Sequence, residues 1–242
     1  MATLLAATML VALLLYALTG GADYGGGLWD LLARGPRAKE QRALIARIIA
    51  PIWEANHVWL ILVVVLMFVG FPTAFARIST SLHIPLLLML FGVVLRGAAF
   101  TFRAYGKASD AEERRWGQIF GAASAGTPVM LGICLGAAVN GQVTANPGDF
   151  ISPWATPFPL CVGVMCLCQF AFLAATYLTV EADERELTAD FARKALRSGA
   201  AAAVAASLAL ILAGDAFRTG LLGSAASLAL MAGAAVATGT GG

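Results

Sequence analysis

The sequence predicts an all-α membrane protein, a polytopic bundle of about seven transmembrane helices with its N-terminus outside. Of its 242 residues, 60% are hydrophobic and only 12% are charged, whereas a soluble domain carries about 25% charged residues. Several apolar stretches reach the roughly 18 residues that are needed to cross a bilayer. The chain is therefore expected to bury most of its surface in lipid or in other helices.

Seven apolar segments are the expected membrane helices. They cover about residues 4–28, 51–71, 82–103, 116–139, 158–180, 198–213 and 221–237. The first lacks a basic leading region, so we expect a retained helix instead of a signal peptide. Pro72 should end the second, because proline disfavours helical geometry in the residue before it. We expect two groups of helices, residues 1–139 and an apparently incomplete second bundle, 155–242.

The charges of the connecting segments predict the orientation. Counted along the six loops, Lys and Arg number 5, 1, 4, 0, 4 and 1, with Arg96 inside the third helix. Basic residues concentrate in cytoplasmic loops, so this alternation places the N-terminus outside. The first loop, WDLLARGPRAKEQRALIAR, is expected to form an amphipathic segment that lies on anionic lipid.

Polar and aromatic residues gather at the head of the second helix, in the segment PIWEANHVW. It contains Trp53, Glu54, Asn56, His57 and Trp59. A carboxylate and an imidazole at the head of a membrane-length helix are costly unless something uses or satisfies them. Glu54 and His57 are three residues apart and share one helix face, and Asn56 and Trp59 share another. This head is a candidate functional site.

The third helix carries an arginine inside its apolar span. Arg96 and Arg103 are seven residues apart and lie on one face. If Arg103 marks the membrane boundary, Arg96 lies roughly 10 Å inside it, too deep to snorkel easily, so we expect a buried polar partner. Asp23, in GGADYGGG at the end of the first helix, is either a solvated helix end or an entry carboxylate. Asp23, Glu54 and Arg103 could together form a proton-conducting entrance that leads towards Arg96.

Several soluble-enzyme classes are not supported by motifs. The chain has no Walker motif, dinucleotide fingerprint or zincin helix, and no evident Ser/His/Asp set. Its four cysteines lie in apolar segments and are expected to be small core side chains. The two histidines, His57 and His83, map to opposite faces of the membrane and should not share one haem. We therefore predict no catalytic, metal-binding or cofactor-binding residue in this chain, and no nucleic-acid partner.

Three motifs carry a resemblance to a known family. The segments PIWEANHVWLI, FPTAFA and LRGAAFTFR resemble subunit II of the cytochrome bd family of quinol oxidases, whose pattern is approximately P-x-W-[DE]-x-N-x-V-W-L, an aromatic-Pro pair and R-G-x-x-F-[DE]-x-R. GGADYGGG is similar to the family's D-G-F-D-x-G-x-G. AATYLTVEADERELTADFARKA resembles the stretch after its fifth helix, so the resemblance covers about residues 10–200.

The resemblance implies a haem-free subunit of a quinol:oxygen oxidoreductase in the bacterial cytoplasmic membrane. The family's subunit I carries haems b and d and the quinol site, and subunit II supports it and contributes to a cytoplasmic proton path. We expect contacts with that partner and with membrane lipid. Carried over by position, the proton-path candidates are Asp23, Glu54, Arg96 and Arg103, and the structural motif positions are Trp53, Asn56, Trp59 and Pro72.

This sequence departs from the family pattern at two acids. One falls on Gly20 and the other on Thr101, whose hydroxyl can relay a proton through water but does not ionise usefully. His57, absent from the family pattern, could compensate. The family has eight helices, so this chain is expected to be a shortened, divergent member. The alternatives are a bd-like scaffold subunit of a non-oxidase electron-transfer complex and a small secondary transporter, although no internal repeat supports the latter.

Overall fold

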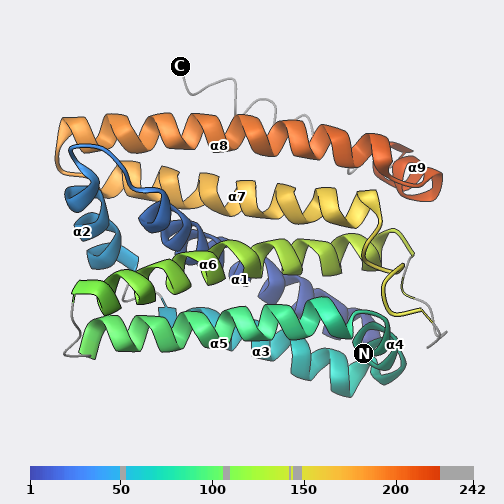
Figure 1. Cartoon of the computed structure of the whole chain (residues 1–242). Helices are drawn as coiled ribbons and strands as arrows, with labels where there is room; N and C mark the ends of the chain where they lie inside the picture. The colour runs from blue at the N-terminus through green and yellow to red at the C-terminus, as the bar shows by residue number, and fades with distance from the viewer. Residues whose placement is uncertain (50–52, 106–109, 142, 144–148, 224–242) are drawn as a thin grey trace.

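A computed structural model describes residues 1–49, 53–105, 110–141, 143 and 149–223, and within these residues all regular structure is helical (Figure 1). The described helices are α1 (Ala2–Leu32), α2 (Ala38–Ile49), α3 (Trp53–Gly70), α4 (Pro72–Ser81), α5 (His83–Tyr105), α6 (Asp110–Val139), α7 (Pro157–Glu181), α8 (Arg185–Leu212) and α9 (Asp215–Gly223). The predicted all-α class is confirmed.

Five of the described helices, α1, α5, α6, α7 and α8, are long and apolar enough to cross a membrane. A sixth span is possible if α3 and α4 are taken as one broken segment, bent by 117° where they meet. The break falls between Gly70 and Pro72, as the proline predicts. The expected seventh helix, 221–237, lies almost entirely outside the described residues, so the count of seven and the outside N-terminus stay predictions.

Helix α1 occupies the middle of the bundle. It packs against α3, α6 and α7, while α5 pairs with α6 and α8 lies at the edge against α7 (Figure 1). The short α2 crosses the end of the bundle at which α1 finishes. Its apolar face carries Leu44 and Ile45, which pack on Leu178 of α7 and Phe191 of α8. The apolar face of the predicted amphipathic segment is therefore buried against α7 and α8, and its contact with anionic lipid stays a prediction.

The glycine-rich stretch of α1 is a packing surface. A Cβ added at Gly25 would lie under 3.0 Å from the Phe170 carbonyl of α7, and one at Gly27 would meet Ser124 of α6 equally closely. The absence of side chains lets three helices approach within backbone contact. The helix therefore continues through these glycines to Leu32 instead of ending near residue 28. Asp23 consequently lies inside the bundle and not at a solvated helix end.

The expected division after residue 139 stays a prediction. Helix α7, the first of the proposed second bundle, packs extensively on α6 and α1 of the first. A core cluster joins Tyr16 and Tyr24 of α1 to Leu131 of α6 and to Cys166 and Phe170 of α7. The apolar core is thus continuous across the boundary.

Candidate functional site

The centre of the bundle holds a buried ion pair between α1 and α5. The side chains of Asp23 and Arg96 are each only 1% exposed. Arg96 Nη1 donates to Asp23 Oδ2 at 2.9 Å, and Nη2 donates to Oδ1 at 2.5 Å. Nη2 also approaches the backbone carbonyl oxygen of Asp23 at 3.3 Å. This two-point geometry compensates both charges inside the apolar bundle, and it gives Arg96 the polar partner that its depth predicts.

Two further helices contribute to the same contacts. Arg96 Nε donates to the Ser124 hydroxyl of α6 at 2.9 Å, and Asn56 Nδ2 of α3 donates to Asp23 Oδ2 at 3.1 Å. We call Asp23, Asn56, Arg96 and Ser124 the Asp23 cluster. It joins α1, α3, α5 and α6 in one hydrogen-bonded unit, so displacing any one of these helices breaks a buried polar contact.

Aromatic rings enclose the guanidinium. The Arg96 Cζ atom lies 4.8 Å from the ring centroid of Tyr24 and 4.8 Å from that of Phe120. Both distances are within the range of cation–π attraction. The pair is almost fully excluded from solvent, and the low dielectric of such a site strengthens its electrostatic interactions.

One atom of the cluster lacks a partner within the described part of the chain. Asn56 Oδ1 is buried and accepts no hydrogen bond there. A buried amide oxygen without a donor is destabilising, and buried polar groups in proteins are commonly satisfied by ordered water. This oxygen is therefore the point of the cluster that is best suited to contact a water molecule.

A second ion pair repeats the first, seven residues along both helices. Arg103 Nη1 of α5 donates to Asp30 Oδ2 of α1 at 3.0 Å. At 1.5 Å per residue it lies about 10 Å from the Asp23–Arg96 pair, towards the α2 end. It is less enclosed, because the Arg103 side chain is 28% exposed. Arg42 of α2 also donates to the backbone carbonyl oxygen of Asp30 at 3.2 Å.

Asp30 was missed by the sequence analysis. The signal was available, because Asp23 and Asp30 have the same seven-residue spacing as Arg96 and Arg103. Two helices that carry acids and arginines at the same heptad spacing can form two ion pairs in a single register.

Thr101 and His57 lie apart from the ion pairs' direct contacts. The Thr101 side chain is exposed, and its hydroxyl donates to the Gly97 carbonyl of its own helix at 3.0 Å. His57 is half-buried, next to Asn56 on α3. The proton-path roles expected of Thr101 and His57 stay predictions.

The remaining motif residues fall on α3 and at its end. Trp59 is half-buried and packs against the core cluster that contains Tyr16 and Tyr24. Trp53 and Glu54 begin α3, but their side chains lie outside the described part of the structure. Among the described side chains at the head of α3, Asn56 is the one that donates a hydrogen bond to Asp23.

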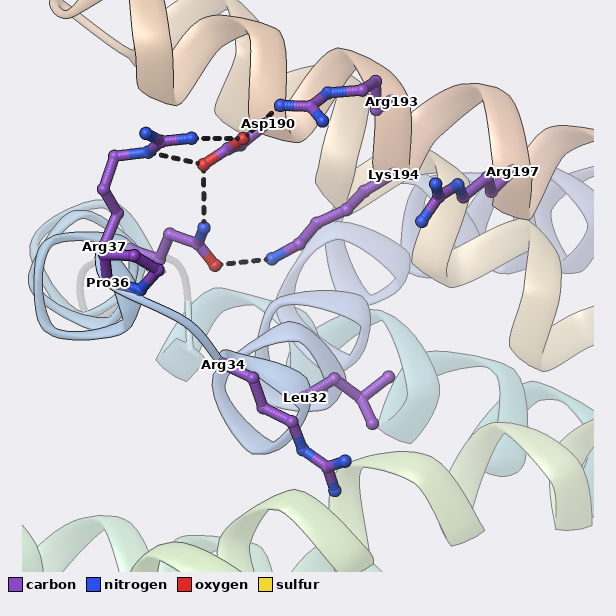
Figure 2. Close-up of a pocket in the computed structure, with 9 residues that line it drawn as sticks. Leu32, Arg34, Pro36, Arg37, Asp190, Arg193, Lys194 and Arg197 are labelled. Carbon is purple, nitrogen blue, oxygen red and sulfur yellow. Dashed lines mark hydrogen bonds and ion pairs between the residues drawn. The ribbon is translucent and has the colours of Figure 1, made fainter.

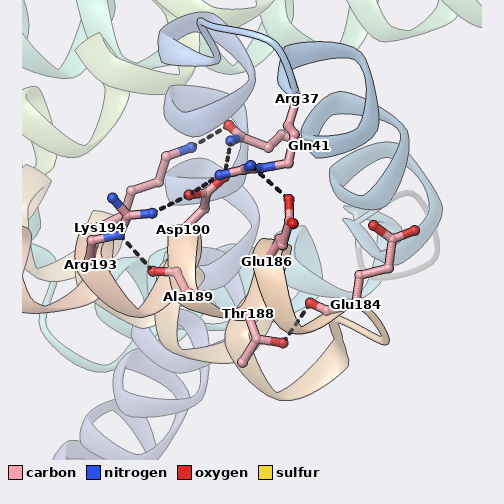
Figure 3. A network of polar contacts seen from close by, with 9 residues as sticks. All are labelled: Arg37, Gln41, Glu184, Glu186, Thr188, Ala189, Asp190, Arg193 and Lys194. Atoms are coloured by element: carbon pink, nitrogen blue, oxygen red, sulfur yellow. Dashed lines mark hydrogen bonds and ion pairs between the residues drawn. The ribbon is translucent and has the colours of Figure 1, made fainter.

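A separate polar network ties α2 to α8 (Figure 3). Arg37 Nε and Nη2 donate to the two carboxylate oxygens of Asp190, each at 2.9 Å. Gln41 Nε2 donates to Asp190 at 3.1 Å and its Oε1 accepts from Lys194 Nζ at 2.8 Å. The hydrogen bonds from Arg37 to Asp190 raise the pKa of the Arg37 guanidinium, so this residue stays charged.

The described residues include no group of three or more His, Cys, Asp or Glu side chains placed to hold a metal ion. His57 lies near the start of α3, at the α2 end, whereas His83 begins α5 at the α4 end (Figure 1). The two imidazoles cannot serve as the axial pair of one haem.

A bundle of span-length helices around a buried Arg–Asp pair defines a polytopic membrane protein with a polar centre. The chain belongs to the cytochrome bd terminal oxidase subunit II family, which it matches over residues 1–241. This family assignment agrees with the motif resemblance at the head of α3 and near the C-terminal end of α5.

Curated relatives carry the same family description, and a solved structure shares the fold. The chain is 28% identical over 184 residues to cytochrome bd-I ubiquinol oxidase subunit 2 of Escherichia coli K12, covering 70% of this chain and 46% of that protein. It is 28% identical to cytochrome bd ubiquinol oxidase subunit 2 of Bacillus subtilis over 66% of this chain and 48% of the relative. The bd oxidase structure from Geobacillus thermodenitrificans superposes with a TM-score of 0.72 at 21% identity, covering 87% of this chain and 66% of that one. The chain spans about half the length of these curated relatives.

Proposed function

We propose that this chain is the haem-free subunit II of a cytochrome bd-type quinol oxidase in the bacterial cytoplasmic membrane. In this proposal it supports a haem-bearing subunit I, which holds haems b and d and takes electrons from quinol. The observation that carries the proposal is the family match over residues 1–241. The similarity to ubiquinol oxidase subunits of E. coli and B. subtilis supports it.

The Asp23 cluster suits the supporting role. It fixes α1, α3, α5 and α6 relative to one another through buried, charge-assisted hydrogen bonds. Such contacts are directional, unlike apolar packing, so they hold the helices in one arrangement. A rigid subunit II would present a constant surface to its partner.

A proton path is the second part of the proposal. Polar side chains continue from Asp30 and Arg103 near the α2 end to Asp23, Arg96 and Asn56 deeper in the bundle. The ion-paired residues would order water and the carriers would be Glu54 and His57 at the head of α3. The buried Asn56 Oδ1 atom supports a water-filled proton path, because this oxygen is still able to accept a hydrogen bond from a water molecule.

The test uses the assembled complex with its haem subunit. In Glu54→Gln we expect slower quinol-driven oxygen uptake and slower proton uptake, with an unchanged reduced-minus-oxidised haem spectrum. Thr176→Val on α7 is the matched control: its hydroxyl is exposed and donates to the Phe172 carbonyl of its own helix, so we expect wild-type rates. Wild-type turnover of Glu54→Gln at every pH would remove Glu54 from the path.

The same preparation separates the proposal from the scaffold alternative. A haem d or high-spin haem b signal in the copurified partner is expected for an oxidase. A partner that carries neither signal would instead identify the chain as a bd-like scaffold subunit of another electron-transfer complex.

A further inference from the structure

The α2 end of the bundle contains a basic pocket, separate from the Asp23 cluster (Figure 2). Its volume is about 250 Å³. The lining residues come from the end of α1, from the turn that leads into α2, from α2 itself and from α8: Leu32, Arg34, Pro36, Arg37, Gln41, Asp190, Arg193, Lys194 and Arg197. Five of these nine side chains are cationic and one is anionic.

The single lining carboxylate is already engaged. Asp190 accepts hydrogen bonds from Arg37 at both oxygens, from Arg193 at 2.6 Å and from Gln41 at 3.1 Å. Lys194 Nζ donates a hydrogen bond to the amide oxygen of Gln41. Arg37 is also paired with Glu186 at 2.8 Å, so five cationic and two acidic side chains leave the pocket a formal excess of three positive charges.

Two arginines at the pocket are available for an external anion. Arg34 and Arg197 are both exposed, and within the described residues neither forms a side-chain hydrogen bond or ion pair. Figure 2 shows both side chains outside the set of contacts around Asp190. Arginine binds phosphate and carboxylate through two parallel N–H donors, which favours a multi-oxygen anion over a halide.

The position of the pocket indicates where that anion comes from. Arg197 precedes the apolar run of α8, and Val204 and Ile211 follow it at successive seven-residue steps on the same helix face. Val204 is 69% exposed and Ile211 is 70% exposed. A cationic group thus stands at the head of an exposed apolar stripe about 21 Å long, which exceeds the thickness of one leaflet, half of a hydrocarbon core of about 30 Å. On the other side of the pocket, Leu32 ends α1.

We propose that this pocket binds the phosphate group of an anionic membrane phospholipid, whose acyl chains lie along the exposed face of α8. The Arg34 and Arg197 side chains point apart in Figure 2 and turn towards the phosphate when it binds, while Arg193 and Lys194 supply further positive charge. Because Arg37, Gln41 and Asp190 link α2 to α8 at the same place, the bound lipid also fastens α2 to the bundle. A zwitterionic lipid carries a compensating cation and gains less from the same charges.

The test measures lipid binding to the purified complex in detergent micelles. Short-chain phosphatidylglycerol, short-chain phosphatidylcholine and inorganic phosphate are titrated separately and bound lipid is counted by native mass spectrometry. For the wild type we expect preference for phosphatidylglycerol over both other probes. For Arg34→Gln/Arg197→Gln we expect at least about tenfold weaker phosphatidylglycerol binding, since each basic residue near an anionic surface contributes about 1 kcal/mol.

The matched control is Arg114→Gln/Arg115→Gln at the start of α6, which removes two exposed arginines outside the pocket. We expect less than a twofold effect there. An Arg34→Lys/Arg197→Lys variant keeps the charge but loses the paired N–H donors, so it should bind phosphatidylglycerol more tightly than the glutamine variant and more weakly than the wild type, and it shows whether loss in the glutamine variant reflects charge or misfolding. Equal weakening in the control, an unchanged affinity in the glutamine variant, or inorganic phosphate and phosphatidylcholine binding as tightly as phosphatidylglycerol would each overturn the proposal.

Discussion

Removing Arg96 should destabilise the bundle more than removing any exposed arginine. In Arg96→Met the Asp23 carboxylate would remain at 1% exposure without its two guanidinium donors. Breaking a buried pair by deleting one partner costs about 3–5 kcal/mol, because an uncompensated charge is left behind. Methionine has similar length and packs well against aromatic rings, so Tyr24 and Phe120 should stay in place. The loss is therefore mainly electrostatic.

The assay is the thermal unfolding midpoint of the purified complex in detergent, measured with a double-mutant cycle. For a chain of this size, 3–5 kcal/mol corresponds to a fall of between about 6 and 20 °C. Asp23→Asn alone should be destabilising for the same reason, since it leaves a buried cation. The double variant Asp23→Asn/Arg96→Met buries no charge, so it should be less destabilised than the sum of the two single variants.

Position 103 provides the matched control. Arg103→Met makes the same change one heptad further along α5, where the Asp30 pair is partly open to solvent. We expect a cost of about 1 kcal/mol, because solvent screens the remaining carboxylate. If Arg96→Met costs no more than Arg103→Met, or if the double variant costs the sum of both single changes, the buried pair does not carry the stability assigned to it.

Two other predictions concern close packing and surface charge. Gly25→Ala should lower the free energy of unfolding by about 1–3 kcal/mol, because the new methyl group would overlap the Phe170 carbonyl. In Gly126→Ala the new methyl group meets nothing within 4 Å, so the unfolding midpoint should stay unchanged or rise. Equal effects of the two alanines would contradict the close approach of α1 and α7. Arg47→Ala should lower the free energy of unfolding by less than about 1 kcal/mol, since its Asp183 partner is 83% exposed, and this small difference should shrink further at high salt. A larger loss would show that α2 depends on this pair.

Local features of the sequence predicted the helices well. Apolar length and the position of Pro72 depend on neighbouring residues alone, so they indicated most span-length helices and the break after α3. The depth of Arg96 predicted a buried polar partner because the cost of a charge in an apolar span does not depend on the fold. Depth alone could not identify that partner. The sequence analysis instead grouped Asp23 with Glu54 and Arg103 in a proton-conducting entrance that leads towards Arg96.

The contacts that were missed depend on the distance between helices. GGADYGGG was placed at the end of the first helix, with Asp23 as either a solvated helix end or an entry carboxylate, but in the bundle its glycines lie within the helix and permit close approach to α6 and α7. That approach keeps α1 helical as far as Leu32 and brings Asp23 inside. The network of Arg37 and Asp190 joins segments 153 residues apart, and no local pattern specifies such a pairing.

The two ion pairs of α1 and α5 show how a few polar residues determine helix register. Asp23–Arg96 and Asp30–Arg103 have the same separation of 73 residues, so both pairs form in one alignment of the two helices. A slip of one turn, about 5.4 Å, would break both pairs at once. A slip of seven residues would allow one new pair but leave an acid and an arginine unpaired in the bundle. Apolar packing tolerates such shifts far better, so we infer that these charges specify alignment as well as contributing stability.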